Sequence, residues 1–276
     1  MDRRTFLGNL ALGTVIIAMG NQQSFAAPLD SDHKRQVVDF LKSIETGDPA
    51  PASIIYPNHY TQHNLMVSDG VAGLRAAQKQ PISSSARMKT VRVYQDGDFV
   101  FAHAEYEFFG PKIGFDIFRF ENGLIVEHWD NLQEMPIRPN PSGRTMIDGA
   151  TEVGELEKTD ANKAPVKGLV EELLGQRRMD RVSSYVDPVT YIQHNPHVGD
   201  GADAMVAAFR QLDAAADTPH RYTHVRQLLG EGSFVLAASE GVAGDGPTAF
   251  YDLFRVANRR IVEHWDVLET IPARGN

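Results

Sequence analysis

Apolar residues at helical spacing open each half of the chain and predict an amphipathic helix there. These residues are Val37, Phe40, Leu41 and Ile44 in the first half, and Val166, Leu169, Val170 and Leu173 in the second. Alanine-rich segments at 71–79 and 202–215 predict a further helix in each half, ahead of a set of strands.

The pattern then changes to the two-residue alternation of half-buried strands, interrupted by Asp-Gly, Gly-Pro and Asn-Gly turns. The predicted strands are 89–95, 99–108, 113–120 and 124–133, followed by 222–229, 234–242, 249–256 and 261–268. Helices followed by a meandering antiparallel sheet are typical of an α+β fold and not of a doubly wound one.

The two halves are copies of one unit. The copied segments are Gln62-His63-Asn64 and Gln193-His194-Asn195, 131 positions apart, and Glu127-His128-Trp129-Asp130 and Glu263-His264-Trp265-Asp266, 136 positions apart. A period this long fits one compact domain per copy. We therefore expect domains at 28–137 and 164–276, joined by a linker at 138–163 that is rich in Pro, Gly, Thr and charge.

Residues 1–27 predict a twin-arginine export signal, with Arg3 and Arg4 ahead of an apolar run and small residues at the usual cleavage spacing. The apolar run is too short to span a bilayer comfortably. We expect a periplasmic or extracellular protein with no stable membrane insertion after the signal is cleaved. The formal net charge of −9 argues against a nucleic-acid partner, and the absence of cysteine excludes disulfides and thiolate chemistry.

The last hairpin of each half carries acidic residues and a histidine among apolar ones. A three-residue loop ending in Gly123 would pair Asp116 with His128 and place Asp130 on the same sheet face. A carboxylate beside an imidazole in apolar surroundings can have a pKa near neutrality, which suits a general acid or base. The alternatives are a purely structural Asp–His bond, or a two-residue turn that would separate the trio. The second half repeats the trio as Asp252, His264 and Asp266.

Other polar residues extend the candidate site. His63, Asn64, His194 and Asn195 follow a helix and are expected to bind ligand at the mouth of a pocket, with capping of a loop as the alternative. His103 is expected to face the first pocket and has no counterpart in the second half, so the first pocket is expected to be the more active. A further hypothesis is a metal site of two histidines and two carboxylates. Its ligands would be His103, His128, Asp116 and Asp130.

Taken together, the motifs resemble those of the SnoaL-like polyketide cyclase family. The residues that carry the likeness are Tyr191-Ile-Gln-His-Asn-Pro196, Asp200-Gly201, and Asp252-Leu-Phe-Arg through Glu263-His-Trp-Asp266, with matching segments in the first half. The resemblance implies a fold like that of nuclear transport factor 2, here as two tandem cones. Each cone would be a curved antiparallel sheet wrapped by about three helices around a ligand cavity.

The same resemblance implies acid–base chemistry without metal or cofactor on an apolar carbonyl compound, such as an aldol condensation, cyclisation or isomerisation. Asp130 and Asp266 would act as acid and base, with Asp116 and Asp252 as their polar partners. The alternative is a non-catalytic binding protein for a hydrophobic small molecule. The resemblance also implies an internal pseudo-dimer across the sheet faces that bear the two tryptophans.

Overall fold

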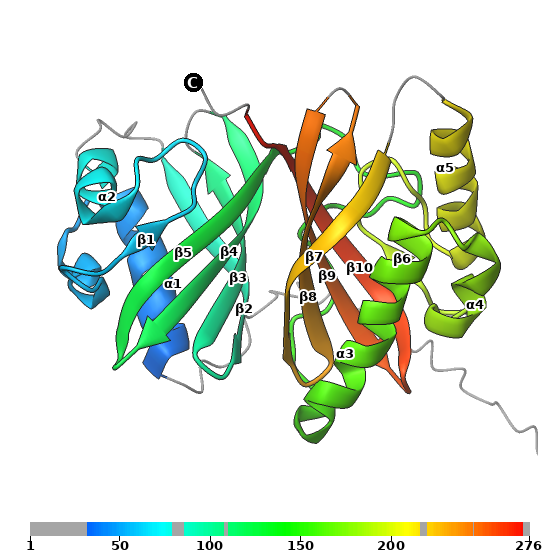
Figure 1. The fold of residues 1–276 in the computed structure, drawn as a ribbon, viewed down its shortest axis with the longest axis horizontal. Coiled ribbons are helices and arrows are strands. Elements are labelled where there is room, and N and C mark those ends of the chain that lie inside the picture. Colours follow the sequence, from blue (N-terminus) through cyan, green and yellow to red (C-terminus); the bar gives the residue numbers. More distant parts are fainter. Residues whose placement is uncertain (1–31, 79–85, 108–109, 216–219, 245, 273–276) are drawn as a thin grey trace, which may run out of the picture.

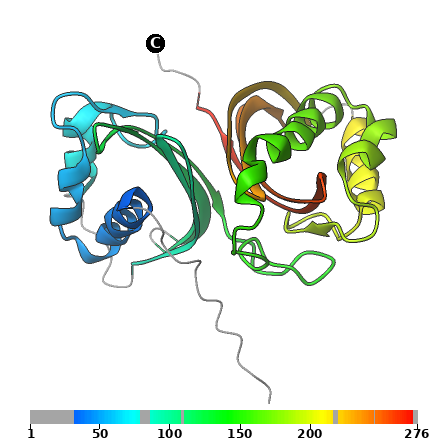
Figure 2. The same cartoon turned by 90° about the horizontal axis from the view of Figure 1, so that it is seen from below.

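The computed structural model describes residues 32–78, 86–107, 110–215, 220–244 and 246–272. It contains two similar α+β halves, each a curved five-stranded sheet with helices against its concave face (Figures 1 and 2). The predicted export signal at 1–27 lies outside the described residues. Within them, no helix is both long and apolar enough to cross a membrane.

In the first half the four long strands follow the helices, as predicted, and one short strand lies between two helices. The helices are α1 (Asp32–Thr46), the 3-10 helix η1 (Ala50–Ile54) and α2 (Gly70–Gln78). The strands are β1 (Thr61–Gln62), β2 (Arg87–Asp96), β3 (Phe99–Glu107), β4 (Pro111–Glu121) and β5 (Leu124–Glu134). In the sheet order β1-β5-β4-β3-β2, the last four strands are antiparallel and the unpredicted β1 runs parallel to β5.

The second half repeats this layout with the sheet order β6-β10-β9-β8-β7. Its helical segments are η2 (Leu156–Lys158), α3 (Thr159–Gly168), the π-helix η3 (Leu169–Gly175), η4 (Met179–Arg181), α4 (Val182–Tyr185) and α5 (Ala202–Ala214). Its strands are β6 (Ile192–Gln193), β7 (His220–Glu231), β8 (Phe234–Ala243), β9 (Gly246–Ala257) and β10 (Arg260–Thr270). Helical structure therefore begins inside the segment predicted as linker.

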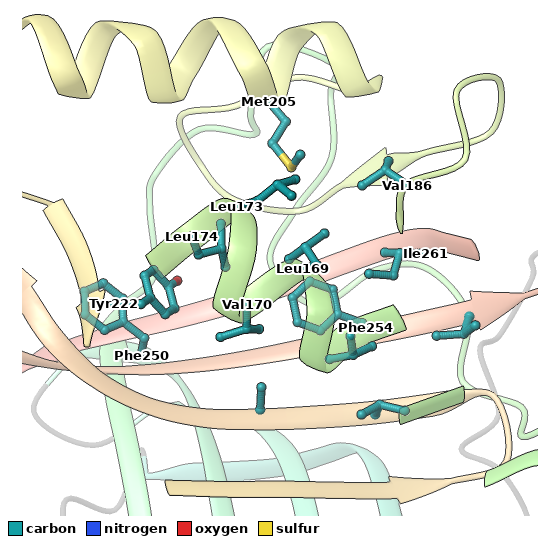
Figure 3. Close-up of a cluster of buried hydrophobic side chains, with 14 of the residues drawn as sticks. Leu169, Val170, Leu173, Leu174, Val186, Met205, Tyr222, Phe250, Phe254 and Ile261 are labelled. Carbon is teal, nitrogen blue, oxygen red and sulfur yellow. The ribbon is translucent and has the colours of Figure 1, made fainter. Parts of the chain in front are cut away.

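Each sheet curves around an apolar core on its concave side. In the first half, Phe40 of α1 packs edge-to-face on Phe118 of β4, with ring centroids 5.8 Å apart. In the second half, Leu169 and Leu173 of η3 share a core with Phe254 of β9 (Figure 3). Full burial of such side chains contributes roughly 1.5–3 kcal/mol each. Each half thus buries a core of its own.

The two sheets face each other through their convex sides (Figure 2). A third apolar cluster lies between them and includes Phe101 and Phe115 from the first sheet and Phe234 from the second. Trp265 is fully buried in this cluster, and Trp129 packs against it while partly exposed. The two faces that carry the tryptophans are therefore the ones that meet.

The turn between β4 and β5 differs from the prediction. Asn122 and Gly123 have φ angles of 52° and 77°, and Glu121 pairs with Leu124 across them. Two central residues with positive φ are typical of a type I′ turn, whose twist matches that of the flanking strands. The hairpin therefore has a two-residue turn, and the predicted three-residue loop is wrong.

A β-bulge next to this turn decides which side chains share a face. A two-residue turn alone would pair Asp116 with Trp129 and separate the trio. The register shifts by one residue beside Val126, so that Asp116 pairs with Asp130. The predicted pairing of Asp116 with His128 is wrong, but the bulge returns all three polar side chains to the concave face. Strands β9 and β10 contain the same shift.

Candidate active site

Strands β4 and β5 hold Asp116, His128 and Asp130 next to one another on the concave face. His128 Nε2 lies 3.1 Å from Asp116 Oδ1, and ligand atoms of all three residues lie within 4.8 Å of one another. The imidazole stacks on Phe118, with ring centroids 4.4 Å apart. Asp116 and His128 are buried, whereas Asp130 is half-buried. The structure thus brings the predicted trio together in an apolar setting.

The other imidazole nitrogen is fixed by Gln62, which the short strand β1 delivers to β5. Gln62 Oε1 accepts a hydrogen bond from the backbone N–H of Asn64 at 3.0 Å and lies 3.0 Å from His128 Nδ1. Because a backbone N–H can only donate, this amide oxygen is oriented as an acceptor, and Nδ1 must carry a proton. Nε2 faces a carboxylate. The surroundings therefore favour an imidazolium that donates from both nitrogens.

Burial and charge set the proton affinities of the trio. Burial raises the pKa of Asp130 to about 6, and the charge of Asp116 adds to this, while His128 and the Asn64 amide act in the opposite direction. Burial acts to lower the pKa of His128, but the hydrogen bond to Asp116 and the two carboxylate charges outweigh it and raise that pKa. A carboxylate that titrates near neutrality therefore lies beside an imidazole that holds its proton.

The second half repeats this arrangement. His264 Nε2 lies 2.9 Å from Asp252 Oδ1, and Nδ1 lies 3.1 Å from Gln193 Oε1. Asn195 Nδ2 donates to Asp266 Oδ2 at 2.6 Å, as Asn64 donates to Asp130 in the first half. Burial and the charge of Asp252 raise the pKa of Asp266 against the opposing effects of His264 and Asn195. Of the four predicted ligand-binding residues in the triplets, the two asparagines therefore lie at the trios.

Each trio also receives a phenol that the sequence did not reveal as a site residue. The Tyr106 hydroxyl donates to Asp116 Oδ2, and the Tyr222 hydroxyl donates to Asp252 Oδ1 at 3.1 Å. Burial and the neighbouring carboxylate raise the pKa of both phenols well above the ordinary value, so both remain protonated donors. The alternation of Tyr106 with the small residues of β3 was a signal for its inward direction, whereas Tyr222 has no tyrosine at the matching place in the first half.

The two histidines of the triplets do not belong to the trios, which corrects their predicted role in ligand binding. Neighbours in a strand face opposite ways, so placing Gln62 inward turns His63 to the convex side. His63 stacks on Trp129, with ring centroids 4.9 Å apart, and pairs with Glu127 at 2.9 Å. His194 takes the equivalent outward position in the second half.

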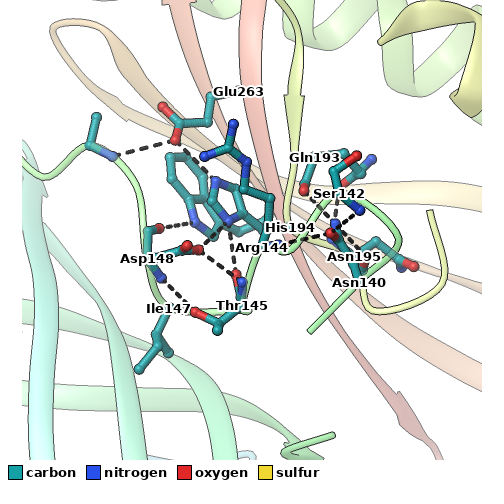
Figure 4. A network of polar contacts seen from close by, with 12 residues as sticks. Asn140, Ser142, Arg144, Thr145, Ile147, Asp148, Gln193, His194, Asn195 and Glu263 are labelled. Carbon is teal, nitrogen blue, oxygen red and sulfur yellow. Dashed lines mark hydrogen bonds and ion pairs between the residues drawn. The ribbon is translucent and has the colours of Figure 1, made fainter. Parts of the chain in front are cut away.

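His194 joins the second sheet to the segment that connects the halves. It stacks on Trp265 and lies 3.0 Å from Glu263 Oε1 and 2.8 Å from both the Thr145 carbonyl and Asp148 Oδ1 (Figure 4). The His194 side chain is only 1% exposed. Its role is architectural.

His103 lies on the convex side as well. It is buried between the sheets, stacks on Phe115 with centroids 4.3 Å apart, and lies 3.1 Å from Arg92 Nη1. The predicted metal site that combined it with His128 and the two carboxylates is therefore wrong. The prediction of a more active first pocket loses its basis, because this imidazole does not distinguish the two concave faces.

Two surface clefts occur away from both trios. One is lined by side chains of α1, β2 and β3, including Lys42 and Glu105. The other runs between the connecting segment and the second sheet and includes Asp148, Glu152 and Arg255. Neither cleft contains a residue of the trios.

No protein-family model and no curated protein matches the chain. Solved structures do. TsrD from Streptomyces laurentii is 23% identical with a TM-score of 0.34, and the match covers 38% of this chain and 92% of TsrD. A SnoaL-like polyketide cyclase from Agrobacterium tumefaciens is 13% identical with a TM-score of 0.32, covering 39% of this chain and 91% of the cyclase. An epoxide hydrolase described as LEH-like, from M. tuberculosis, is 15% identical with a TM-score of 0.33, covering 41% and 85%.

Each of these matches covers a length that corresponds to about one half of this chain. The substrates and activities of these proteins are not evidence for those of this chain. The function of this chain has to be sought in its own side chains.

Proposed function

We propose that the protein is an enzyme that performs cofactor-independent acid–base chemistry on a small, apolar carbonyl compound. Asp130 and Asp266 are the bases, and the reaction is an aldol condensation, cyclisation or isomerisation. One observation carries this proposal: a carboxylate whose pKa is raised to about 6 lies beside an imidazole whose two nitrogens face Gln62 and Asp116.

The proposed first step is removal of a proton from the carbon next to the substrate carbonyl. Asp130 takes that proton, the C–H electron pair moves into the C–C bond, and the carbonyl oxygen becomes an enolate oxygen. A base that titrates near the working pH is ionised and yet binds the proton strongly enough to return it. His128 supplies positive charge beside the reacting centre and keeps Asp130 ionised in its apolar surroundings.

Asp116 and Gln62 then have a positioning role. Each accepts from one nitrogen of His128, so the ring can neither rotate nor lose its orientation without breaking a buried hydrogen bond. The counterparts Asp252 and Gln193 hold His264 in the same way.

The variants Asp130→Asn, Asp266→Asn and their double combination test the assignment. The assay follows loss of the α-proton from cyclic ketones and β-keto esters by NMR in deuterated water. We expect each single variant to abolish the exchange catalysed by its own half. The double variant should exchange the α-proton at least about 100-fold more slowly than the unaltered protein, which is the usual size of a general-base effect. Glu127→Gln, on the convex face of the same strand, is the matched control and should keep the full rate.

Unchanged exchange in the double variant would refute the role of the aspartates. Saturable binding of the same compounds without exchange in the unaltered protein would instead identify a binding protein.

We extend the proposal to location: the protein acts after export by the twin-arginine route, in the periplasm or outside the cell. The support is the Arg3-Arg4 pair, the apolar run and the small residues near position 26. Replacement of both arginines by lysine should retain the protein in the cytoplasm, as fractionation would detect. Export of that variant at the normal level would contradict this route.

A further inference from the structure

The phenol that reaches the buried aspartate comes from a different strand in each half. Tyr106 lies on β3, whereas Tyr222 lies on β7, which by sheet order is the counterpart of β2. In the first half Tyr106 pairs across the strands with Met88, and in the second half Tyr222 pairs with Gly241. The aspartates fix the alignment, because Asp116 pairs with Ala102 and Asp252 with Ala237, four residues before the positions in question.

The cross-strand pair Met88 and Tyr106 therefore corresponds to Tyr222 and Gly241. The tyrosine has changed strands, and its partner has changed with it. A Cβ atom on Gly241 would lie 2.0 Å from the carbonyl oxygen of Arg221 and 3.0 Å from Tyr222 Cα. Glycine at 241 therefore allows the backbone of β7 at Arg221 and Tyr222 to approach β8 closely.

Both halves place a tyrosine hydroxyl at the buried aspartate, although the strand that carries the large side chain differs between them. Both tyrosines are buried, at 2% and 7% exposure, and both donate to the aspartate that binds the imidazole. A residue needed only for packing would be replaced well enough by another apolar side chain of similar size. Here a tyrosine on either of two different strands donates its hydroxyl to the equivalent aspartate.

The strand that carries the tyrosine does change which carboxylate oxygen accepts the hydrogen bond from its hydroxyl. In the first half the hydroxyl binds Oδ2 of Asp116 and the imidazole binds Oδ1. In the second half hydroxyl and imidazole both bind Oδ1 of Asp252, and Oδ2 has no hydrogen-bond partner among the described residues. The shared element is thus the donor, not a particular oxygen.

We propose that Tyr106 and Tyr222 are one positioning residue carried on two different strands, whose hydroxyl holds the buried aspartate in its contact with the imidazole. The catalytic importance of that alignment rests on the proposed function, but the alignment itself does not. The hydrogen bond to Asp116 and the two carboxylate charges raise the pKa of His128, so loss of the alignment should lower that pKa toward its ordinary value.

A strand-transfer experiment tests this in the full chain. Three variants are compared with the unaltered protein: Tyr106→Phe, the double variant Met88→Tyr with Tyr106→Gly, and the double variant Met88→Phe with Tyr106→Gly. The second rebuilds the arrangement of the second half inside the first, and the third has the same bulk without the hydroxyl. The measurement is the pH titration of the His128 imidazole by ¹⁵N NMR, which reports the pKa of that imidazole and so its contact with Asp116.

We expect the midpoint of the imidazole titration to move down by about one pH unit in Tyr106→Phe, return to its original position in the Met88→Tyr double variant, and remain displaced in the Met88→Phe one. An unchanged titration in folded Tyr106→Phe would overturn the proposal. So would a Met88→Tyr variant that behaves like its Met88→Phe control.

Should a double variant fail to fold, the folded Tyr106→Phe variant read at His128 still decides the test. The NMR result does not depend on turnover. If the titration follows the hydroxyl while no carbon acid exchanges its proton, the proposed function fails and the positioning role stands.

Discussion

The concave and convex faces of the two sheets have diverged to different degrees. On the concave side, the distance between imidazole Nδ1 and the glutamine oxygen is 3.0 Å in the first half and 3.1 Å in the second, and the remaining contacts of the trio recur as well. On the convex side, the histidines of the two Gln-His-Asn triplets differ in exposure. The His63 side chain is 40% exposed, whereas that of His194 is 1% exposed beneath the connecting segment.

The contrast separates the polar trios, which the two halves share, from the convex residues that join the halves. Glu127 and Glu263 occupy the same place in the repeat, each paired with a histidine and an arginine. Only Glu263 is fully buried. One of the two equivalent ion pairs is thus buried where the halves pack together, while the polar trios on the concave faces remain alike.

The strongest test of this contrast compares Glu263→Gln with Glu127→Gln. Removing one partner of a buried ion pair costs about 3–5 kcal/mol of unfolding free energy, whereas the exposed pair contributes about 0–1 kcal/mol. Burial acts to raise the pKa of Glu263, but the hydrogen bonds from His194 and Arg255 outweigh it and lower that pKa. The contribution of Glu263 is therefore present at neutral pH and is lost as the pH falls below the ordinary value for glutamate.

Urea unfolding at pH 7 and pH 4 measures both effects. Equal costs for the two glutamate variants at pH 7 would remove the distinction between the two convex faces.

A smaller effect is expected from Arg92, which holds the connecting segment to the first sheet. Its guanidinium donates to the carbonyls of Ile147, Asp148 and Ala150 at 2.6–3.2 Å and lies 4.2 Å above the Trp265 ring. Arg92→Met leaves buried carbonyls without donors and should cost about 2–4 kcal/mol.

The second-half counterpart of Arg92 by register is Gln227, which gives a matched control. Gln227→Met should cost less than about 1 kcal/mol. The readouts are thermal unfolding and the rate of proteolysis within 140–151. A segment that is cut no faster in Arg92→Met than in the control would show that Arg92 does not hold it.

The smallest change in unfolding free energy, and the only one expected to stabilise the protein, is predicted for Asp130 on the concave face of the first sheet. The pKa of Asp130 is raised to about 6 in the native state, above the value of about 3.9 for an unfolded chain, so ionising it at higher pH costs folding free energy. Asp130→Asn should therefore stabilise the protein by about 1–3 kcal/mol at pH 8, with the gain disappearing below about pH 4. Asp98→Asn, in an exposed turn, is the control. A loss of stability of Asp130→Asn at pH 8 would contradict the claim that ionised Asp130 destabilises the folded protein.

Much of the architecture could be predicted from local pattern, because alternation and helical spacing depend on neighbours alone. The repeat of Asp116, His128 and Asp130 in the second half pointed to a trio that the structure does bring together. The register could not be predicted, since the bulge at Val126 depends on how the strand meets its partner. Neither could the direction of His63, because a two-residue strand has too little alternation to show that Gln62 and not the histidine points inward.

The central claim is that each concave face holds a coupled carboxylate and imidazole, and the titration of His128 in the unaltered protein tests it most directly. ¹⁵N NMR of the imidazole at pH 7 should show both nitrogens protonated, with a further inflection near pH 6 from Asp130 that is absent in Asp130→Asn. A neutral imidazole at pH 7, with a single titration step that Asp130→Asn leaves unchanged, would contradict the account.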